Sequence, residues 1–324
     1  MPLNDLLQTG LRYGAEYKDR LSSHLPMALI ALHRLGGTDD ELQRFNDRYV
    51  RRLEPIDAGV APVDGDGWTA LLGQHSRNAD LRQRFQQDIA ARGTDDVLRA
   101  SLPTLLPGVA GGAFHPLIRL AYGLEAQHDG EIAEALASWV MAHLPLPQQG
   151  PASTTVDTLD EVAAALRAQP TLQAYVASGG NIFERLAAVN AMPAFQERPA
   201  PKTLTLDGMR QFALRVYAAD DSFTALHMVT ASHAARVVAE AVPDVAPLLL
   251  RELWIALAAA YVTVDMPEPV APPPPTHAWA DIVAQARTST DDHVVKFVHS
   301  CQVEAQHYDD DTYRSLAARK AKLA

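Results

Sequence analysis

Four histidines occupy comparable positions in four separate stretches of this sequence. His24, His115, His227 and His293 each lie at or near the start of an apolar run with helical spacing. Apolar neighbours indicate that these side chains face the interior, where an imidazole is costly unless it is hydrogen-bonded or bound to a metal. Helical bundles build metal centres from one such side chain per helix, and imidazole suits iron, zinc, copper and nickel. The four residues predict a central, buried metal site, whereas a single histidine of this kind is more often an ordinary core residue.

Two further side chains accompany the four histidines. Lys296 follows His293 by three residues, so both lie on one face of a helix. A protonated lysine has no lone pair for a metal, so Lys296 can join such a site only after its amine is chemically changed. The ordinary alternative is a solvated lysine whose chain runs along the helix toward water. His233 is six residues after His227, so one straight helix does not point both the same way, and we expect His233 to orient a ligand or touch a substrate.

The other histidines are predicted to be peripheral. Their neighbours are typical of solvated side chains, or they belong to the last helix and its tail: His33, His75, His128, His143 and His277 in the first group, His299 and His307 in the second.

Composition and charge exclude several classes of protein. A net charge of −11 over 324 residues argues against a nucleic-acid-binding surface, which needs clustered lysine and arginine. The single cysteine, Cys301, cannot form a disulfide within the chain, and a cytoplasmic location is expected. The beginning of the sequence has an early aspartate and no apolar run, so no signal peptide is predicted. The most apolar stretch, residues 253–264, is too short to span a bilayer and predicts a buried core helix rather than membrane attachment.

Helix signals recur along the chain, and the sequence predicts an all-α, single multi-helix domain over residues 1–324. Capping residues, periodic apolar positions and Gly or Pro stops predict helices within 22–37, 38–55, 81–93, 96–108, 113–130, 131–145, 158–170, 181–193, 204–220, 222–243, 247–264 and 290–308. A proline-rich loop is expected at 265–276, and a polar C-terminal tail from about residue 309. Phosphate-loop, GxGxxG, GxSxG, HExxH and CxxC motifs do not occur, so nucleotide-dependent and serine-hydrolase chemistry lack support, and no site for NADPH is visible.

Five stretches resemble, in order, the block pattern of the questin oxidase-like proteins from about residue 15 to 310. They are SHLPMALIALHRLGGTDDEL, AFHPLIRLAYGLE, ALHMVTASHAARVV, WIALAAAYVTV and DDHVVKFVHSC. Fungal members of this family oxidatively open a ring of anthraquinone-type polyketides, with a Baeyer–Villiger-like outcome and without a flavin-binding fold. The resemblance implies one non-haem Fe²⁺ held by four histidines and a carboxylated lysine. It assigns these roles here to His24, His115, His227 or His233, His293, and Lys296 as its CO2-derived carbamate.

The resemblance therefore implies an oxygenase that uses dioxygen on a small aromatic, quinone-type substrate. With His227 as the ligand, His233 becomes the candidate catalytic residue. Tyr122, Trp254 and Tyr261 are candidate substrate-binding residues, and the last two are seven apart, on one side of a helix.

Three other functions remain open from the sequence. A haem-binding or haem-oxygenase-like protein would use one histidine as an axial ligand. A non-enzymatic helical scaffold would keep its histidines as core residues, and a hydrolase would place zinc in the same pocket.

Overall fold

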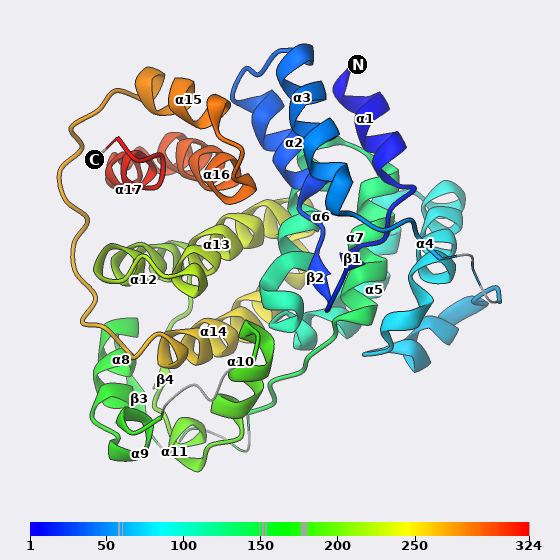
Figure 1. The fold of residues 1–324 in the computed structure, drawn as a ribbon. Helices are drawn as coiled ribbons and strands as arrows, with labels where there is room; N and C mark the ends of the chain where they lie inside the picture. Colours follow the sequence, from blue (N-terminus) through cyan, green and yellow to red (C-terminus); the bar gives the residue numbers. More distant parts are fainter. Residues whose placement is uncertain are drawn as a thin grey trace.

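The computed structural model of the chain describes residues 1–57, 59, 61–148, 150, 152, 154–175 and 180–323. Helices dominate these residues, which confirms the predicted all-α class (Figure 1). The α-helices are α1 (Leu3–Gly10), α2 (Leu25–Arg34), α3 (Asp39–Tyr49), α4 (Asn78–Arg92), α5 (Thr94–Leu105), α6 (His115–Ala126), α7 (Asp129–Met141), α8 (Leu159–Arg167), α9 (Pro170–Gln173), α10 (Ile182–Asn190), α11 (Pro193–Gln196), α12 (Leu206–Ala219), α13 (Phe223–Ala241), α14 (Ala246–Thr263), α15 (Trp279–Thr288), α16 (Asp292–Tyr308) and α17 (Thr312–Lys320).

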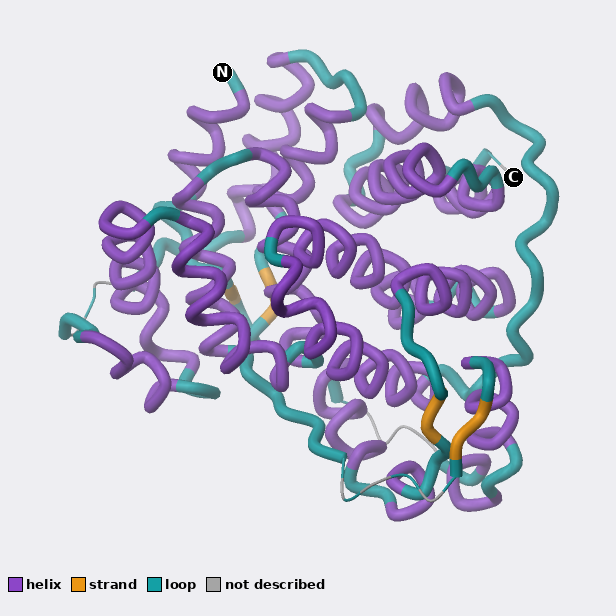
Figure 2. The backbone as a smooth tube through the Cα atoms, turned by 180° about the vertical axis from the view of Figure 1, so that it is seen from behind, coloured by secondary structure: helices purple, strands orange, loops and turns teal. Residues whose placement is uncertain are grey.

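Short 3-10 turns and two very small sheets complete the described structure. The turns are η1 (Val50–Arg52), η2 (Gly65–Leu71), η3 (His75–Arg77), η4 (Leu106–Gly108), η5 (Gly111–Phe114) and η6 (Pro243–Val245). Strands β1 (Glu16–Tyr17) and β2 (Leu21–Ser22) pair antiparallel, and β3 (Thr155–Val156) and β4 (Ala200–Pro201) pair parallel. Figure 2 shows these two sheets as isolated ladders among the helices.

Four helices from distant parts of the sequence form the centre of the fold. α13 packs against α6 and α16, and α2 packs against α6 and α16. Their contact faces are almost entirely apolar or small, as in Leu25–Leu32 of α2 and Thr224–Ala235 of α13, where every residue is buried. Helices that are apolar on all sides belong in the interior of a large domain. The arrangement brings the beginnings of α2, α6, α13 and α16 to one region.

Local capping agrees with the sequence signals. Thr38 and Glu41 form the capping box predicted at the start of α3. The same reciprocal pattern begins α8 at Thr158 and α10 at Asn181. These caps satisfy the first free N–H groups of each helix and fix where it begins.

Two predictions about the C-terminal third have different outcomes. Residues 266–276 have no regular secondary structure, as predicted for the proline-rich loop, which runs along the outer edge of the molecule from α14 to α15 in Figure 1. The prediction of a polar tail from residue 309 is wrong, because α17 forms there and packs against α16. Tyr313, Leu316 and Ala317 give that segment a buried face at helical spacing, which its many charges conceal in the sequence.

The most apolar helix is buried, as predicted, but it is longer than the run 253–264. Among the described residues, one helical segment, Pro243–Thr263, is long and apolar enough to cross a membrane by length and composition, and 72% of its apolar window is buried inside the protein. A core helix of this kind passes the same test.

Candidate metal centre

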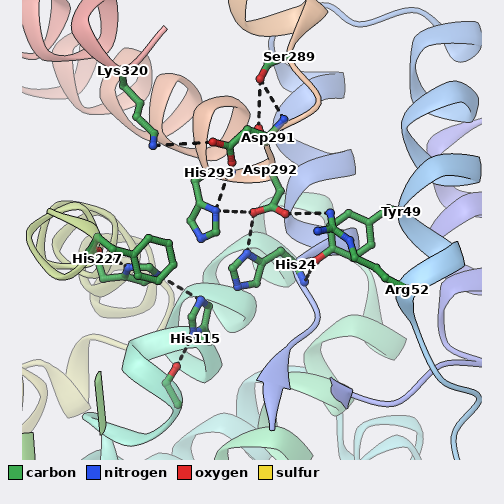
Figure 3. A network of polar contacts seen from close by, with 12 residues as sticks. His24, Tyr49, Arg52, His115, His227, Ser289, Asp291, Asp292, His293 and Lys320 are labelled. Carbon is green, nitrogen blue, oxygen red and sulfur yellow. Dashed lines mark hydrogen bonds and ion pairs between the residues drawn. The ribbon is translucent and has the colours of Figure 1, made fainter. Parts of the chain in front are cut away.

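The beginnings of four helices carry the predicted histidines to one place. His24 is the N-cap of α2, His115 is the first residue of α6, His227 is in the second turn of α13 and His293 is the second residue of α16. In Figure 3 their rings surround a common space. The ring centroid of His24 lies 4.4 Å from that of His115 and 4.6 Å from that of His293. The ring centroids of His115 and His227 lie 4.8 Å apart.

Each of these four rings is held through its Nδ1 atom by an oxygen acceptor. Asp292 Oδ1 lies 2.8 Å from His24 Nδ1 and 2.7 Å from His293 Nδ1. The carbonyl oxygen of Phe223 lies 2.7 Å from His227 Nδ1, and the carbonyl oxygen of Gly112 accepts from His115 Nδ1. A carbonyl or carboxylate oxygen requires a proton on the facing nitrogen, so every Nδ1 is the donor and every Nε2 is left with a lone pair.

The Nε2 atoms show that the residues fit a metal ion. His115 Nε2 and His227 Nε2 are 3.1 Å apart, and with both Nδ1 atoms protonated no hydrogen lies between them. Two ligands at right angles, each about 2.1 Å from one ion, would be roughly 3 Å apart. His293 Nε2 is buried without a hydrogen-bond partner, and one ring nitrogen each of His24, His115 and His293 lies within 4.8 Å of the others. A cation requires lone pairs that converge without protons between them. A hydrogen-bonded core would instead place a proton between two such nitrogen atoms.

Electrostatics keeps the rings of His24, His115 and His227 neutral, as metal ligands must be. Burial, together with the positive charge of Lys296, lowers the pKa of His24 to about 3. Burial is also the largest cause that puts the pKa values of His115 and His227 well below the usual range. The Asp292 carboxyl keeps a pKa far below normal despite its burial, because His24 and His293 donate to it. Asp292 is therefore a charged acceptor that orients two imidazoles at once.

The backbone before α6 is unusual at the point where His115 is held. Gly112, Ala113 and Phe114 have φ values of 54°, 55° and 67°, all in the left-handed region. Side chains other than glycine rarely adopt this conformation. The bend turns the Gly112 carbonyl back onto the ring of His115, so local strain fixes the orientation of that imidazole.

Lys296 is buried, and the alternative of a solvated lysine is wrong. Its exposed fraction is 3%. Burial lowers the pKa of its amine to about 8. Its charge in turn lowers the pKa values of His24, His115 and His227, so the amine lies within electrostatic reach of the four-histidine cluster.

An open pocket of about 400 Å³ leads to the cluster. Its walls include Tyr17, Tyr49, Arg52, Phe223, His24, His115, Asp292 and His293. Phe223 is 50% exposed, and its ring centroid lies 4.4 Å from His227 and 4.6 Å from His293. The Arg52 guanidinium sits 3.6 Å over the Tyr49 ring and 3.2 Å from Asp292. An aromatic wall and a cation thus flank the imidazoles.

A larger hollow, of about 520 Å³, lies elsewhere and is lined by none of the four cluster histidines or Lys296. Of these two hollows, only the smaller one is lined by histidines of the cluster.

The other predicted site residues lie outside this pocket. Trp254 and Tyr261 share one helix face, as predicted, and that face packs against Phe212 in the core. Tyr122 is buried, and its hydroxyl donates to the backbone oxygen of Lys296. His233 points to a different place, with its Nδ1 2.8 Å from Glu304. The structure thus brings together the rings of His24, His115, His227 and His293, with the buried Lys296 within electrostatic reach of them. It leaves Tyr122, Trp254, Tyr261 and His233 outside the pocket.

Two predictions about the other histidines are wrong, because His128 was expected to be solvated and His299 to be peripheral. His299 is 2% exposed and His128 is 7% exposed. His128 is the N-cap of α7 and accepts from the backbone N–H of Glu131. His299 lies in the interior on α16 beside Tyr122. Sequence reasoning also missed Asp292, Arg52 and Phe223; the adjacency of Asp292 to His293 was the one available signal for them.

A sequence profile described as "Questin oxidase-like" matches residues 21–301, a range that includes the four cluster histidines and Lys296. The chain is 32% identical over 127 residues to a questin oxidase of Aspergillus terreus, covering 36% of this chain and 28% of that protein. It is 32% identical over 126 residues to the Baeyer-Villiger oxidase AgnL3 of Paecilomyces divaricatus (35% and 27%) and 30% identical over 139 residues to the oxidoreductase AflY of Aspergillus parasiticus (39% and 28%). The matched parts span little more than a quarter of these relatives' lengths.

Proposed function

This chain belongs to the questin oxidase-like family, and we propose that it is an oxygenase that depends on one non-haem iron ion. The reaction is a Baeyer–Villiger-like oxidation or an oxidative ring cleavage of a small aromatic, quinone-type polyketide by dioxygen. The observation that carries the proposal is the set of four imidazoles whose Nδ1 atoms each face an oxygen acceptor, with the Nε2 atoms of His115 and His227 3.1 Å apart.

The proposed ligands are His24, His115, His227, His293 and Lys296 as a carbamate. Carbamate formation joins the neutral lysine nitrogen to the carbon of CO2 and releases one proton, which changes a cationic donor into an anionic oxygen ligand. With a pKa of about 8, roughly one Lys296 amine in ten is neutral at pH 7, compared with roughly one in three thousand for an ordinary lysine. Burial thus supports the modification at this position.

When bound, non-haem iron supplies one-electron chemistry with dioxygen that amino-acid side chains cannot supply. Residues of the chain orient the ligand rings and line the pocket for the substrate. Asp292 orients two of the ligand rings, and the Phe223 ring provides an apolar face for a flat aromatic substrate. Arg52, at the pocket wall, is suited to a phenolate or quinone oxygen.

The geometry argues against the competing functions. A haem needs a flat slot beside its axial ligand, whereas Nε2 atoms 3.1 Å apart leave no room for a macrocycle between His115 and His227. A scaffold with core histidines would pair each Nε2 with a donor, and His293 Nε2 is buried without one. Zinc suits the same imidazoles, so metal analysis must separate a hydrolase from an oxygenase.

The test is metal analysis and oxygen uptake with protein purified anaerobically without a histidine tag. We expect iron in wild-type protein and oxygen uptake with hydroxylated anthraquinones. We expect His115→Ala and His227→Ala to lose one equivalent of iron and the oxygen uptake. His33→Ala, at an exposed position of α2, is the matched control and should keep both. Zinc without oxygen uptake, or full iron content in the two cluster variants, would reject the proposal.

A further inference from the structure

A second group of ligand-type side chains is buried further along three of the same helices. It consists of Glu125 of α6, His233 of α13 and His299 of α16. One ligand atom from each lies within 4.8 Å of the others. His233 Nε2 is 3.4 Å from Glu125 Oε1, and His299 Nε2 is 3.9 Å from Glu125 Oε2. We call this group the Glu125 cluster.

The two rings of the Glu125 cluster are oriented in the same way as those of the four-histidine cluster. Glu304 Oε1 lies 2.8 Å from His233 Nδ1, and Arg236 donates to that same oxygen at 2.7 Å. The Tyr122 hydroxyl lies 3.3 Å from His299 Nδ1. Both Nδ1 atoms are occupied, so both Nε2 atoms are turned toward Glu125.

Two atoms at the centre of this cluster have no hydrogen-bond partner. They are His233 Nε2 and Glu125 Oε2, both buried. The His233 side chain is 0% exposed. A charge-assisted hydrogen bond is about 2.7–2.9 Å long, so 3.4 Å from His233 Nε2 to Glu125 is too far for a good one. Buried polar atoms without partners are uncommon, and here two of them lie in one cluster.

We propose that Glu125, His233 and His299 bind a second divalent transition-metal ion. Two imidazoles and one carboxylate are the ligand set that first-row divalent ions occupy in many proteins, with positions left for water. Glu304 and Tyr122 are positioning residues that fix the two rings. This site stands apart from the function proposed above, because none of its ligands belongs to the four-histidine cluster.

The spacing along the helices separates the two ions. Glu125 is ten residues after His115, and His233 and His299 are each six residues after a ligand of the four-histidine cluster. At 1.5 Å of rise per residue these offsets correspond to roughly 9–15 Å. One ion cannot reach both groups, so each cluster holds its own.

The competing description is an ion pair without metal. Burial opposes the protonation of His233, but Glu125 and Glu304 outweigh it and raise its pKa to about 9. His233 would then be a cation between two carboxylates. That description has no role for His299. Burial lowers the pKa of His299 to about 4, so its imidazole stays neutral. His299 therefore distinguishes the two descriptions.

The experiment counts Co²⁺ ions bound per chain after reconstitution and desalting, by mass spectrometry of the metal and by visible absorption. We expect two equivalents in wild-type protein, one in His299→Ala, one in His115→Ala and none in the double variant. Glu125→Gln, which keeps the shape of the side chain, should also bind one and guards against a folding defect in His299→Ala. His307→Ala, a half-exposed position on the same helix, should bind two.

The outcomes separate the two proposals. A count in His299→Ala and Glu125→Gln equal to that of wild-type protein overturns the second site. If wild-type protein binds one Co²⁺ ion per chain and His115→Ala binds none, the second site is also overturned and the proposed function stays intact. One equivalent that disappears in His299→Ala and Glu125→Gln but persists in His115→Ala supports the second site and rejects the four-histidine centre.

Discussion

Asp292 offers the sharpest test of the four-histidine centre, because one carboxylate serves two proposed ligands. Its Oδ1 accepts from both His24 Nδ1 and His293 Nδ1, while its Oδ2 accepts from Arg52 at 3.2 Å. In Asp292→Asn the carbonyl oxygen can keep both rings, and the amide nitrogen then faces Arg52. The Arg52 side chain is 41% exposed and can turn into water, so the variant loses the negative charge but keeps the orientation of the rings.

The size of the loss follows from these contacts. Removing one carboxylate that orients a ligand histidine lowers metal affinity by about 10–100-fold. Asp292→Asn retains an acceptor for both rings, so we expect a 10–100-fold loss of metal affinity, which is about 1.4–2.8 kcal/mol of binding free energy. Asp292→Ala leaves both Nδ1 atoms without their acceptor, and we expect the two losses to combine to about 10²–10⁴-fold.

The assay is competition for Fe²⁺ against a chromophoric chelator under anaerobic conditions. It is repeated in the His299→Ala background, so that an ion at the Glu125 cluster does not mask the result. Asp281→Asn, an exposed aspartate on α15, is the control for the change in net charge. Iron binding by Asp292→Ala as tight as that by Asp281→Asn would refute the reasoning, because Asp292 would then hold no ligand.

Three further predictions follow from single contacts. Lys296→Ala should lose iron and should lack the carbon-13 carbamate signal that labelled bicarbonate gives in wild-type protein. Added acetate should restore part of the bound iron, and retention of the carbamate signal would contradict the assignment to Lys296. Phe223→Ala should leave the iron content unchanged and raise KM for an aromatic substrate about tenfold, since one ring contact contributes about 1–1.5 kcal/mol, and an unchanged KM would place the substrate elsewhere. In metal-free protein the raised pKa of His233, about 9 against 6.5 unfolded, should stabilise the fold fully below pH 6.5 and lose that stabilisation as pH rises to 9. The difference in unfolding free energy between wild-type protein and His233→Gln should therefore shrink by roughly 3 kcal/mol between pH 6 and pH 9.5, and a difference independent of pH would contradict the ion pair with Glu125 and Glu304.

The sequence was informative where one helix alone decides the outcome. Apolar neighbours on both sides of His115 and His227 indicate burial, and both are buried. The six-residue offset between His227 and His233 predicts that they point in different directions, and the structure turns them toward different clusters. Helical geometry within one segment is sufficient for such statements.

The sequence failed where the partner comes from another helix. Asp292 matters because His24, 268 residues earlier, meets it across the helix interface. His299 was expected at the periphery because it belongs to the last predicted helix, yet it is buried, and Ser300 and Glu304 face inward as well and form hydrogen bonds there. A buried polar face looks the same in a sequence as a solvated one, since only tertiary contacts show whether its polar atoms have partners.

The four-histidine cluster weakens the fold as long as nothing lies between its ring nitrogens. The lone pairs of His115 and His227 face each other at 3.1 Å, and His293 Nε2 has no partner. A buried unsatisfied polar atom costs about 1–3 kcal/mol, and each of the left-handed residues Ala113 and Phe114 adds about 1–3 kcal/mol of backbone strain. Selection for stability alone would replace these residues, so their presence together indicates selection for chemistry. An ion that binds only the folded chain reverses the balance, because at a concentration 1,000 times its Kd it contributes about 4 kcal/mol. The same residues that destabilise the metal-free protein thus make its folding depend on the ion.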